Sequence, residues 1–314
     1  MQMQISDSEY RELEGINASL LKRFVNPKPS NITEESLYYE EDSKALLIGG
    51  IVDSFLTDIN KLEQVYYISD MDNKPSDAII SICKNLFDDG ITLENKDLVL
   101  SYAREVGYNN RYKDDTLYDD VVKKGEAYYN SLVLSKDKKI ISKEEYDKSL
   151  RTVNSLITHQ YTSMFFEGKL FEETKFQQVW TAQYQGFTLK GMTDGYIPSK
   201  NTLYDIKTTG KSTLDFKDAI RDYHYDLQAY VYILLAELNG VNINTFLFIV
   251  ESTKSPGLPL KYVLERGDSC YLSGKAKFEQ ALKNYQLYTD TGVMCPYDIY
   301  INKGFVSLET YESN

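Results

Sequence analysis

The residues best suited to catalysis lie between Gly191 and Tyr232. Asp194 stands near the end of one expected strand, and Asp205, Ile206 and Lys207 lie in the next one. Residues two apart in a strand project from the same face, so Asp205 and Lys207 point together while Ile206 enters the core. Asp194 can lie near them across a β-hairpin. Two carboxylates and an ammonium group in one pocket suit the cutting of phosphodiester bonds.

Such a pocket is suited to Mg²⁺, which takes hard oxygen ligands in an octahedron and keeps several waters. Asp194 and Asp205, with the carbonyl of Ile206, would hold one ion and leave positions for phosphate and water. The ion would lower the pKa of that water and offset charge in the transition state. Lys207 would orient the attacking water or help to deprotonate it. The alternative is a cross-strand salt-bridge cluster on an exposed sheet face, and the residues alone do not separate the two.

The D-x-K string by itself carries little information, because the chain contains eight [DE]-x-K triplets. The triplet at Asp205 differs from the others in its setting: it falls in a strand pattern beside a second strand that carries an acid. The other seven are interpreted as ordinary charged surface.

Gln228 and Tyr232 are polar residues on an otherwise apolar helix. They are four residues apart, which places them on one helical face. We expect them to lean over the sheet edge, where an amide and a hydroxyl group can bind phosphate oxygens of a substrate. The alternative is a polar pair on the helix surface.

Alternating and helical patterns predict an α/β fold with a central mixed β-sheet flanked by helices, a helical N-terminal region and an insertion. A long amphipathic helix is expected over residues 144–170, with Tyr161 and Met164 on its apolar side. Three strands are expected next, at residues 176–185, 187–197 and 202–209, followed by helices at 214–223 and 225–238. Two further strands, at 244–252 and 258–267, and a last helix at 269–290 complete the core.

The chain is expected to have three parts. Residues 1–59 form the N-terminal helical part, residues 60–143 a mostly helical insertion, and residues 144–314 the core. The insertion is rich in Lys, Asp, Glu and Tyr and carries no recognisable chemistry. It would shape a binding channel or contact a partner.

Composition sets limits on the partner and the compartment. A net charge of −12 argues against a broad surface that coats nucleic acid, but it allows a local basic groove around an acidic metal pocket. Cys83, Cys270 and Cys295 form no CxxC pair, so neither a disulfide framework nor a zinc ribbon is expected. A signal peptide and a membrane span are not expected either. A reduced, cytoplasmic setting fits these features.

Four segments, taken in order, resemble the PD-(D/E)XK nuclease superfamily, in its RecB-like branch with RecE (exonuclease VIII) and phage recombination exonucleases. INASLLKRFVNP resembles the opening segment of these proteins, and GGIVDSFL resembles their GxxxH helix. GMTDGY with LYDIKTT matches the core motif, and Gln228 with Tyr232 matches the QxxxY helix. The resemblance covers roughly residues 15–56 and 165–265.

The resemblance implies a restriction-endonuclease-like core with Asp194, Asp205 and Lys207 as catalytic residues. It also implies a metal-ligand role for Asp53, which stands where many relatives have His, although its spacing alone favours a solvent-facing position. Relatives often supply another acid just before the core hairpin, and the nearest candidates, Glu172 and Glu173, leave the register open. With three scattered cysteines, an iron–sulfur cluster is not expected.

The resemblance further implies a deoxyribonuclease dependent on Mg²⁺ (or Mn²⁺), an exonuclease of recombination or repair in a bacterial or phage-infected host cell. The direction would be 5′→3′, DNA would be the substrate, a single-strand annealing protein a partner, and a homo-oligomer the assembly. The alternative is a non-catalytic nuclease-fold subunit that binds DNA ends or a protein. The acidic charge and the presence of Asp53 where many relatives have His favour this alternative, and the intact Asp194, Asp205 and Lys207 oppose it.

Overall fold

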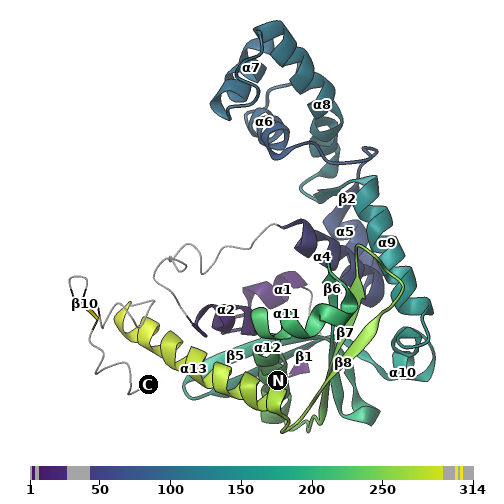
Figure 1. The fold of residues 1–314 in the computed structure, drawn as a ribbon, viewed down its shortest axis with the longest axis vertical. Coiled ribbons are helices and arrows are strands. Elements are labelled where there is room, and N and C mark those ends of the chain that lie inside the picture. The colour runs from purple at the N-terminus through teal and green to yellow at the C-terminus, as the bar shows by residue number, and fades with distance from the viewer. Residues whose placement is uncertain (1, 4–6, 27–42, 293–300, 303–304, 307–314) are drawn as a thin grey trace. The chain divides into compact units, whose positions relative to one another are not determined.

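The computed structural model describes residues 2–3, 7–26, 43–292, 301–302 and 305–306, and the chain divides into two compact units (Figure 1). The first unit comprises Met1–Leu46 and Asn154–Asn314, and the second comprises Leu47–Val153. The three-part division expected from the sequence, with boundaries after residues 59 and 143, stays a prediction.

The first unit is built on a six-stranded mixed sheet with the order β1-β4-β5-β6-β7-β8. Strands β6 and β7 run parallel, and every other neighbouring pair is antiparallel. The expected α/β architecture is therefore confirmed. The sequence patterns did not predict β1, which pairs with β4. The strands are β1 (Gln2–Met3), β4 (Lys175–Tyr184), β5 (Phe187–Ile197), β6 (Thr202–Thr209), β7 (Thr245–Ser252) and β8 (Leu260–Glu265).

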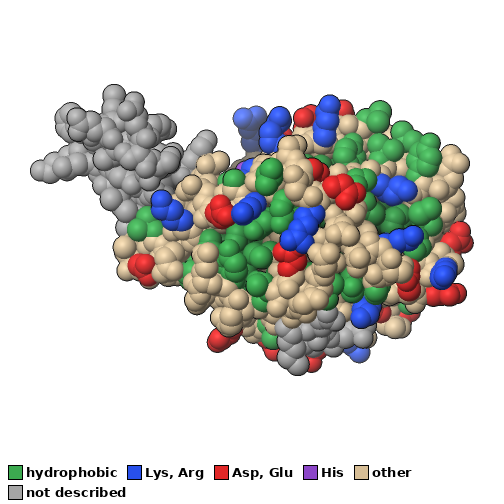
Figure 2. All heavy atoms as spheres, turned by 90° about the horizontal axis from the view of Figure 1, so that it is seen from below, with side chains coloured by type: hydrophobic (Ala, Val, Ile, Leu, Met, Phe, Trp, Pro, Cys, Tyr) green, Lys and Arg blue, Asp and Glu red, His purple; other side chains and the backbone are tan. Residues whose placement is uncertain are grey.

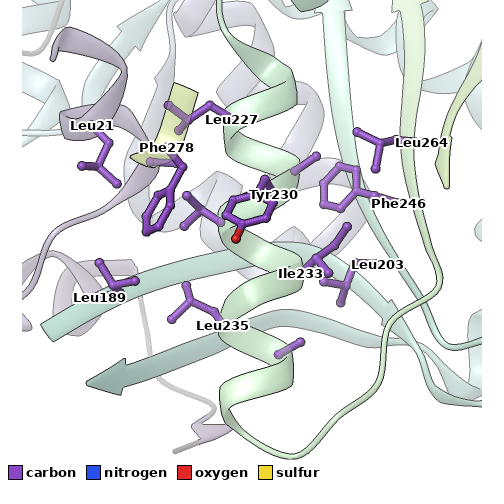
Figure 3. Packing of buried hydrophobic residues seen from close by; sticks show 14 of the residues in the cluster. Leu21, Leu189, Leu203, Leu227, Tyr230, Ile233, Leu235, Phe246, Leu264 and Phe278 are labelled. Carbon is purple, nitrogen blue, oxygen red and sulfur yellow. The ribbon is translucent and has the colours of Figure 1, made fainter. Parts of the chain in front are cut away.

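One helix, α12 (Tyr225–Leu238), is central to the core of this unit. Apolar residues surround it almost completely, and a helix of that kind must be buried on all sides. It packs against β4 and β5 and against α2 (Ala18–Arg23), α11 (Phe216–Asp222) and α13 (Ser269–Thr291). Figure 3 shows its apolar side chains meeting Leu21, Leu203, Phe246 and Phe278. Helix α1 (Asp7–Glu12) precedes α2.

The long helix expected over residues 144–170 is interrupted. Helix α9 (Lys143–Thr158) is followed by a 3₁₀ turn, η1 (Ser163–Phe165), and by α10 (Gly168–Glu173). The Thr162 hydroxyl donates a hydrogen bond to the Leu156 carbonyl at 2.6 Å, which satisfies an acceptor at the helix end. Tyr161 and Met164 are 45% and 44% exposed, so their predicted place on an apolar helix face was wrong.

The second unit is mostly helical. Helices α6 (Asp77–Asp88), α7 (Lys96–Glu105) and α8 (Asp114–Ser135) enclose an aliphatic core that includes Ile82 and Val121. Helix α4 (Lys44–Thr57) leads into the unit, and α5 (Ile59–Val65) follows it. The short strands β2 (Tyr66–Ile68) and β3 (Lys139–Ile141) pair in parallel.

Two further features complete the described chain. Strands β9 (Ile301–Asn302) and β10 (Phe305–Val306) pair antiparallel. Among the residues with described structure, no helix combines the length and the apolar character needed to cross a bilayer.

Candidate active site

The candidate site lies where β5 and β6 separate. The turn between them is formed by η2 (Pro198–Lys200) and by Asn201 in the left-handed conformation. Pairing runs from Ile197 with Thr202 to Gly195 with Tyr204. Asp194 and Asp205 are the next residues beyond the last pair, and Asp194 Oδ2 accepts a hydrogen bond from the Ile206 N–H at 2.6 Å. The Asp194 carboxylate thus binds the backbone of β6 where the strand ladder has ended.

Close approach of the two strands at this point depends on Gly195. A Cβ atom on Gly195 would lie 2.1 Å from Cζ of Tyr204. The Tyr204 ring is fully buried and packs edge-on against Phe165, with 5.6 Å between ring centroids. A residue with a side chain would therefore move the ring or spread the strands, which would alter the spacing of Asp194 and Asp205.

Asp205 and Lys207 project from the same sheet face, toward α12, and form an ion pair. Asp205 is 3% exposed, and the Lys207 side chain is 22% exposed. The strand alternation predicted from the sequence therefore brings these two residues together. Ile206, which was expected to enter the core, is only half-buried on the opposite face. The cause is the exposure of the last part of β6, where Ile206 to Thr209 are all half-buried.

The charges around Lys207 favour its ammonium form. Burial alone would lower its pKa, but the charges of Asp205, Tyr225 and Asp194 and the contact with Asp205 outweigh burial and raise the pKa above its ordinary value. A protonated lysine donates hydrogen bonds and cannot take up a proton. Which of the two roles expected for Lys207 it takes stays a prediction.

Gln228 and Tyr232 lie inside the site rather than on the helix surface. Gln228 is buried, and its Nε2 donates to Asp205 Oδ1 at 2.8 Å and to the Tyr232 hydroxyl at 3.4 Å. Burial and the Asp205 charge raise the pKa of Tyr232 well above its ordinary value. The amide therefore orients the Asp205 carboxylate, and binding of substrate by this pair stays a prediction.

Lys22, on α2, also belongs to the site, and the sequence patterns did not single it out. Its Nζ donates to Gln228 Oε1 at 2.9 Å and lies 4.6 Å from the centroid of the Tyr225 ring. Burial and the charge of Lys207 lower the pKa of Lys22 to about 7, against the opposing charges of Asp205 and Asp226. Lys22 falls within the INASLLKRF segment, but no spacing rule links residues 206 apart.

Asp53 belongs to the second unit and has two local contacts there. Lys61 Nζ lies 3.7 Å from Asp53 Oδ2, and the Thr57 hydroxyl donates to Asp53 Oδ1 at 3.4 Å. Its role as a metal ligand stays a prediction. Glu172 is exposed at the end of α10, and Glu173 accepts a hydrogen bond from the Ser199 hydroxyl.

The donor chemistry of the site fits a hard divalent cation. Within the described parts of the chain, no three Asp, Glu, His or Cys side chains gather closely enough to hold a metal ion. The ligands expected from the sequence, which are the carboxylates of Asp194 and Asp205 and the carbonyl of Ile206, stay a prediction. Carboxylate and peptide oxygens are the ligands that Mg²⁺ prefers, and a small set leaves coordination positions for water and phosphate.

A second buried acid, Glu251 on β7, lies outside this pocket. It pairs in register with Thr208, so its side chain projects from the face opposite Asp205. Its carboxylate accepts hydrogen bonds from the Ser155 hydroxyl and from the Gly257 N–H, the latter at 3.2 Å. Glu251 therefore orders the segment after β7 and is not a further metal ligand.

Surface charge is mixed on the face of the molecule that Figure 2 shows. Lysine and arginine side chains are interspersed there with acidic and hydrophobic ones. This agrees with the net charge of −12, which argues against a broad surface that coats nucleic acid.

The structure resembles solved structures of exonuclease-related proteins. A protein from Eubacterium rectale, described as a candidate exonuclease, matches over 99% of this chain and 99% of its own, with a TM-score of 0.53 and 15% identity. At that identity the likeness shows a common fold. A phage-related exonuclease from Haemophilus somnus 129PT matches over 47% of this chain and 84% of its own, with a TM-score of 0.27 and 14% identity, which is too low to support an argument.

The remaining comparisons concern sequence. A search of curated proteins gives no match. One family model matches residues 17–294, a range that contains α2, the hairpin residues Asp194, Asp205 and Lys207, and the helix with Gln228 and Tyr232. The chain therefore belongs to the PD-(D/E)XK superfamily, in the family described as a PDDEXK-like domain of unknown function (DUF3799).

Proposed function

We propose that this protein is a divalent-metal-dependent deoxyribonuclease that hydrolyses phosphodiester bonds from DNA ends. The observation that carries the proposal is the convergence of Asp194, Asp205 and Lys207 where β5 and β6 separate, in a chain of a PDDEXK-like family. A surface salt-bridge cluster would not account for the burial of Asp205 or for its hydrogen bond to a buried glutamine.

Each residue of the site has a part in this reaction. Asp194 and Asp205 would hold Mg²⁺ or Mn²⁺, with the Ile206 carbonyl as a further ligand and Asp53 as the ligand implied by the resemblance. The bound ion supplies a water of lowered pKa and offsets negative charge on the phosphate. Lys207 donates hydrogen bonds that orient the attacking water or a phosphate oxygen. Gln228 holds the Asp205 carboxylate in place, and Tyr232 presents a hydroxyl group to the substrate.

The mode of action and the setting of the reaction extend the proposal. The exonuclease mode, the 5′→3′ direction and a role in phage or bacterial recombination or repair follow from the resemblance to RecE-like enzymes. The same resemblance supports a cytoplasmic location, a single-strand annealing partner and a homo-oligomer. Co-purification with a co-expressed annealing protein tests the partner, and light scattering tests the homo-oligomer.

Digestion of end-labelled linear duplex and of closed circular DNA tests the function itself. The wild type is expected to release label from the linear substrate with Mg²⁺ or Mn²⁺, to spare the circle and to stop when EDTA is added. Asp205→Asn should be inactive. Asp215→Asn is the matched control, because Asp215 belongs to an exposed D-x-K triplet, and it should retain activity.

Two outcomes would contradict parts of the proposal. Cleavage of the closed circle at the same rate as the linear duplex would replace the exonuclease mode with an endonuclease mode. Binding of DNA ends without cleavage under any metal condition would instead support the non-catalytic subunit, which the net charge of −12 favours.

A further inference from the structure

Lys22 completes a chain of polar contacts that ends at the proposed metal ligand. Its ammonium group donates to Gln228 Oε1 at 2.9 Å, and Gln228 Nε2 donates to Asp205 Oδ1 at 2.8 Å. The other carboxylate oxygen of Asp205 pairs with Lys207. Both oxygens of Asp205 therefore have a partner. One of these partners is Gln228, which is itself bound by Lys22.

The chemistry of the amide makes the role of Lys22 directional. A glutamine amide has one end that accepts hydrogen bonds and one end that donates them, and the two ends are nearly the same size. In its ammonium form, which a pKa of about 7 makes the major form below neutral pH, Lys22 can only donate, so it requires the oxygen end of the amide, and the nitrogen end then faces Asp205. Reversing the amide would place a carbonyl against a buried carboxylate and NH₂ against NH₃⁺. Both contacts are unfavourable in a buried site.

Helix α2 is anchored firmly enough to give Lys22 a fixed position. Before the helix, the Ile16 N–H donates to the Thr188 carbonyl at 2.8 Å, which joins this segment to β5. Asn17 caps the helix by accepting from the Leu20 N–H at 2.8 Å. After the helix, the buried Phe24 carbonyl accepts from Asn284 Nδ2 at 2.8 Å. Contacts at both ends thus attach α2 to the sheet and to α13.

One aromatic ring, that of Tyr225, lies close to both lysines of the site. The Tyr225 ring centroid lies 4.6 Å from Lys22 Nζ and 5.1 Å from Lys207 Nζ. The ring stacks on Phe216, with 5.6 Å between centroids and 16° between planes. Both ammonium groups gain cation–π stabilisation from one ring.

We propose that Lys22 is a positioning residue, which holds the Gln228 amide on Asp205 and so fixes the carboxylate that serves the reaction. The inference rests on the proposed function. It assigns to the N-terminal helix a part in the site that is separate from binding DNA. Two experiments test it, and the second does not depend on cleavage.

The kinetic experiment compares variants on end-labelled linear duplex with Mg²⁺. Lys22→Met should lower kcat about tenfold and change KM less than about twofold, as expected when the partner of a ligand is lost. Lys22→Arg, which keeps a donor for Gln228 Oε1, should retain kcat within about threefold of the wild type. In a Gln228→Met background, Lys22→Met should lower kcat by less than about a further twofold, because the two residues act as a unit.

The control is Lys217→Met, which removes the same charge from an exposed position on α11 and should leave kcat unchanged. A rise in KM with unchanged kcat for Lys22→Met would overturn the proposal in favour of direct DNA binding. If Lys22→Met lowers kcat by the same factor in the wild type and in Gln228→Met, Lys22 does not act through Gln228. A lower melting temperature with unchanged kcat would show a structural role alone.

The second experiment follows the Gln228 side-chain amide by NMR of ¹⁵N-labelled full-length protein, with the resonance assigned by its absence in Gln228→Met. Hydrogen exchange at Nε2 should be at least about tenfold faster in Lys22→Met than in the wild type, and nearly unchanged in Lys22→Arg. Unchanged exchange in Lys22→Met would overturn the positioning role. If the wild type shows no metal-dependent cleavage, the proposed function fails, and this measurement still decides whether Lys22 positions Gln228.

Discussion

The carboxylate of Asp194 accepts a hydrogen bond from the backbone N–H of Ile206 at 2.6 Å. Asp194 and Ile206 lie on neighbouring strands, just beyond the last paired residues of the β5–β6 ladder. This contact fixes one oxygen of Asp194 on the backbone that links Asp205 to Lys207. The three groups of the D-x-K site therefore share a rigid frame, and changes to that frame should alter both stability and activity.

Lys207 is expected to be essential for activity. Lys207→Met should lower kcat at least about a hundredfold, because it removes the donor nearest the reacting groups. Lys217→Met, in the exposed triplet of α11, should retain activity within about twofold. Both variants should show the same far-ultraviolet circular dichroism. Wild-type activity in folded Lys207→Met would contradict the assignment.

Gly195 is expected to tolerate no side chain. Gly195→Ala places a methyl group 2.1 Å from the Tyr204 ring, and overpacking of this kind costs about 1–3 kcal/mol in the free energy of unfolding. Activity should fall as well, because the strands that carry Asp194 and Asp205 must separate. Urea unfolding followed by fluorescence of Trp180, the chain's one tryptophan, measures the change in the first unit.

The matched control for this substitution is Gly210→Ala. A Cβ atom on Gly210 would meet no heavy atom within 4 Å, so its free energy of unfolding should change by less than about 0.5 kcal/mol. Equal unfolding curves for Gly195→Ala and Gly210→Ala would show that the close approach to Tyr204 is not a constraint.

The buried Asp226 and the half-buried Lys277 form an ion pair that attaches α12 to α13. Lys277 Nζ lies 2.8 Å from Asp226 Oδ2, and the Ser273 hydroxyl donates to the same oxygen at 2.7 Å. Lys277→Met leaves the buried Asp226 carboxylate without its cation, so it should lower the free energy of unfolding by about 3 kcal/mol. Lys275→Met, two residues away in an exposed pair with Glu279, should cost less than about 0.5 kcal/mol. Similar costs for both variants in Trp180-monitored unfolding would contradict the buried role.

Cys83 should report unfolding of the second unit. Burial raises the pKa of its thiol to about 12, and its Sγ donates to the Gly125 carbonyl at 3.6 Å. A thiol of this kind reacts slowly with a disulfide reagent at pH 8, since the thiolate is the nucleophile. In a Cys270→Ser, Cys295→Ser variant, labelling should require unfolding and should accelerate with urea. Labelling in buffer at the rate of the unfolded chain would show that α6 and α8 open readily.

Local patterns were sufficient to predict much of the fold. Strand alternation around Asp205 selected one of eight [DE]-x-K triplets, and the structure pairs Asp205 with Lys207 as expected. Helical periodicity also placed Gln228 and Tyr232 on one face. It did not predict the end of α9 at Thr158, because that end depends on a hydrogen bond from Thr162 to Leu156. Periodicity alone carries no information on such a contact.

The contacts that complete the site could not be predicted from the sequence. Asp205 and Gln228 are 23 residues apart, and Lys22 and Gln228 are 206 apart, so packing of α2 and α12 on the sheet decides both contacts. The sequence also did not predict that Gln228 is buried, because a polar residue on an apolar helix can face solvent or a buried partner at the same spacing.

Calorimetric titration with Mn²⁺ tests most directly whether Asp194 and Asp205 share a divalent ion. The wild type and the control Asp215→Asn should bind Mn²⁺ saturably with equal affinity, whereas Asp194→Asn and Asp205→Asn should each lose that binding while still folded, as a cooperative Trp180 unfolding transition would show. Binding of wild-type strength in either of these two variants would contradict the account.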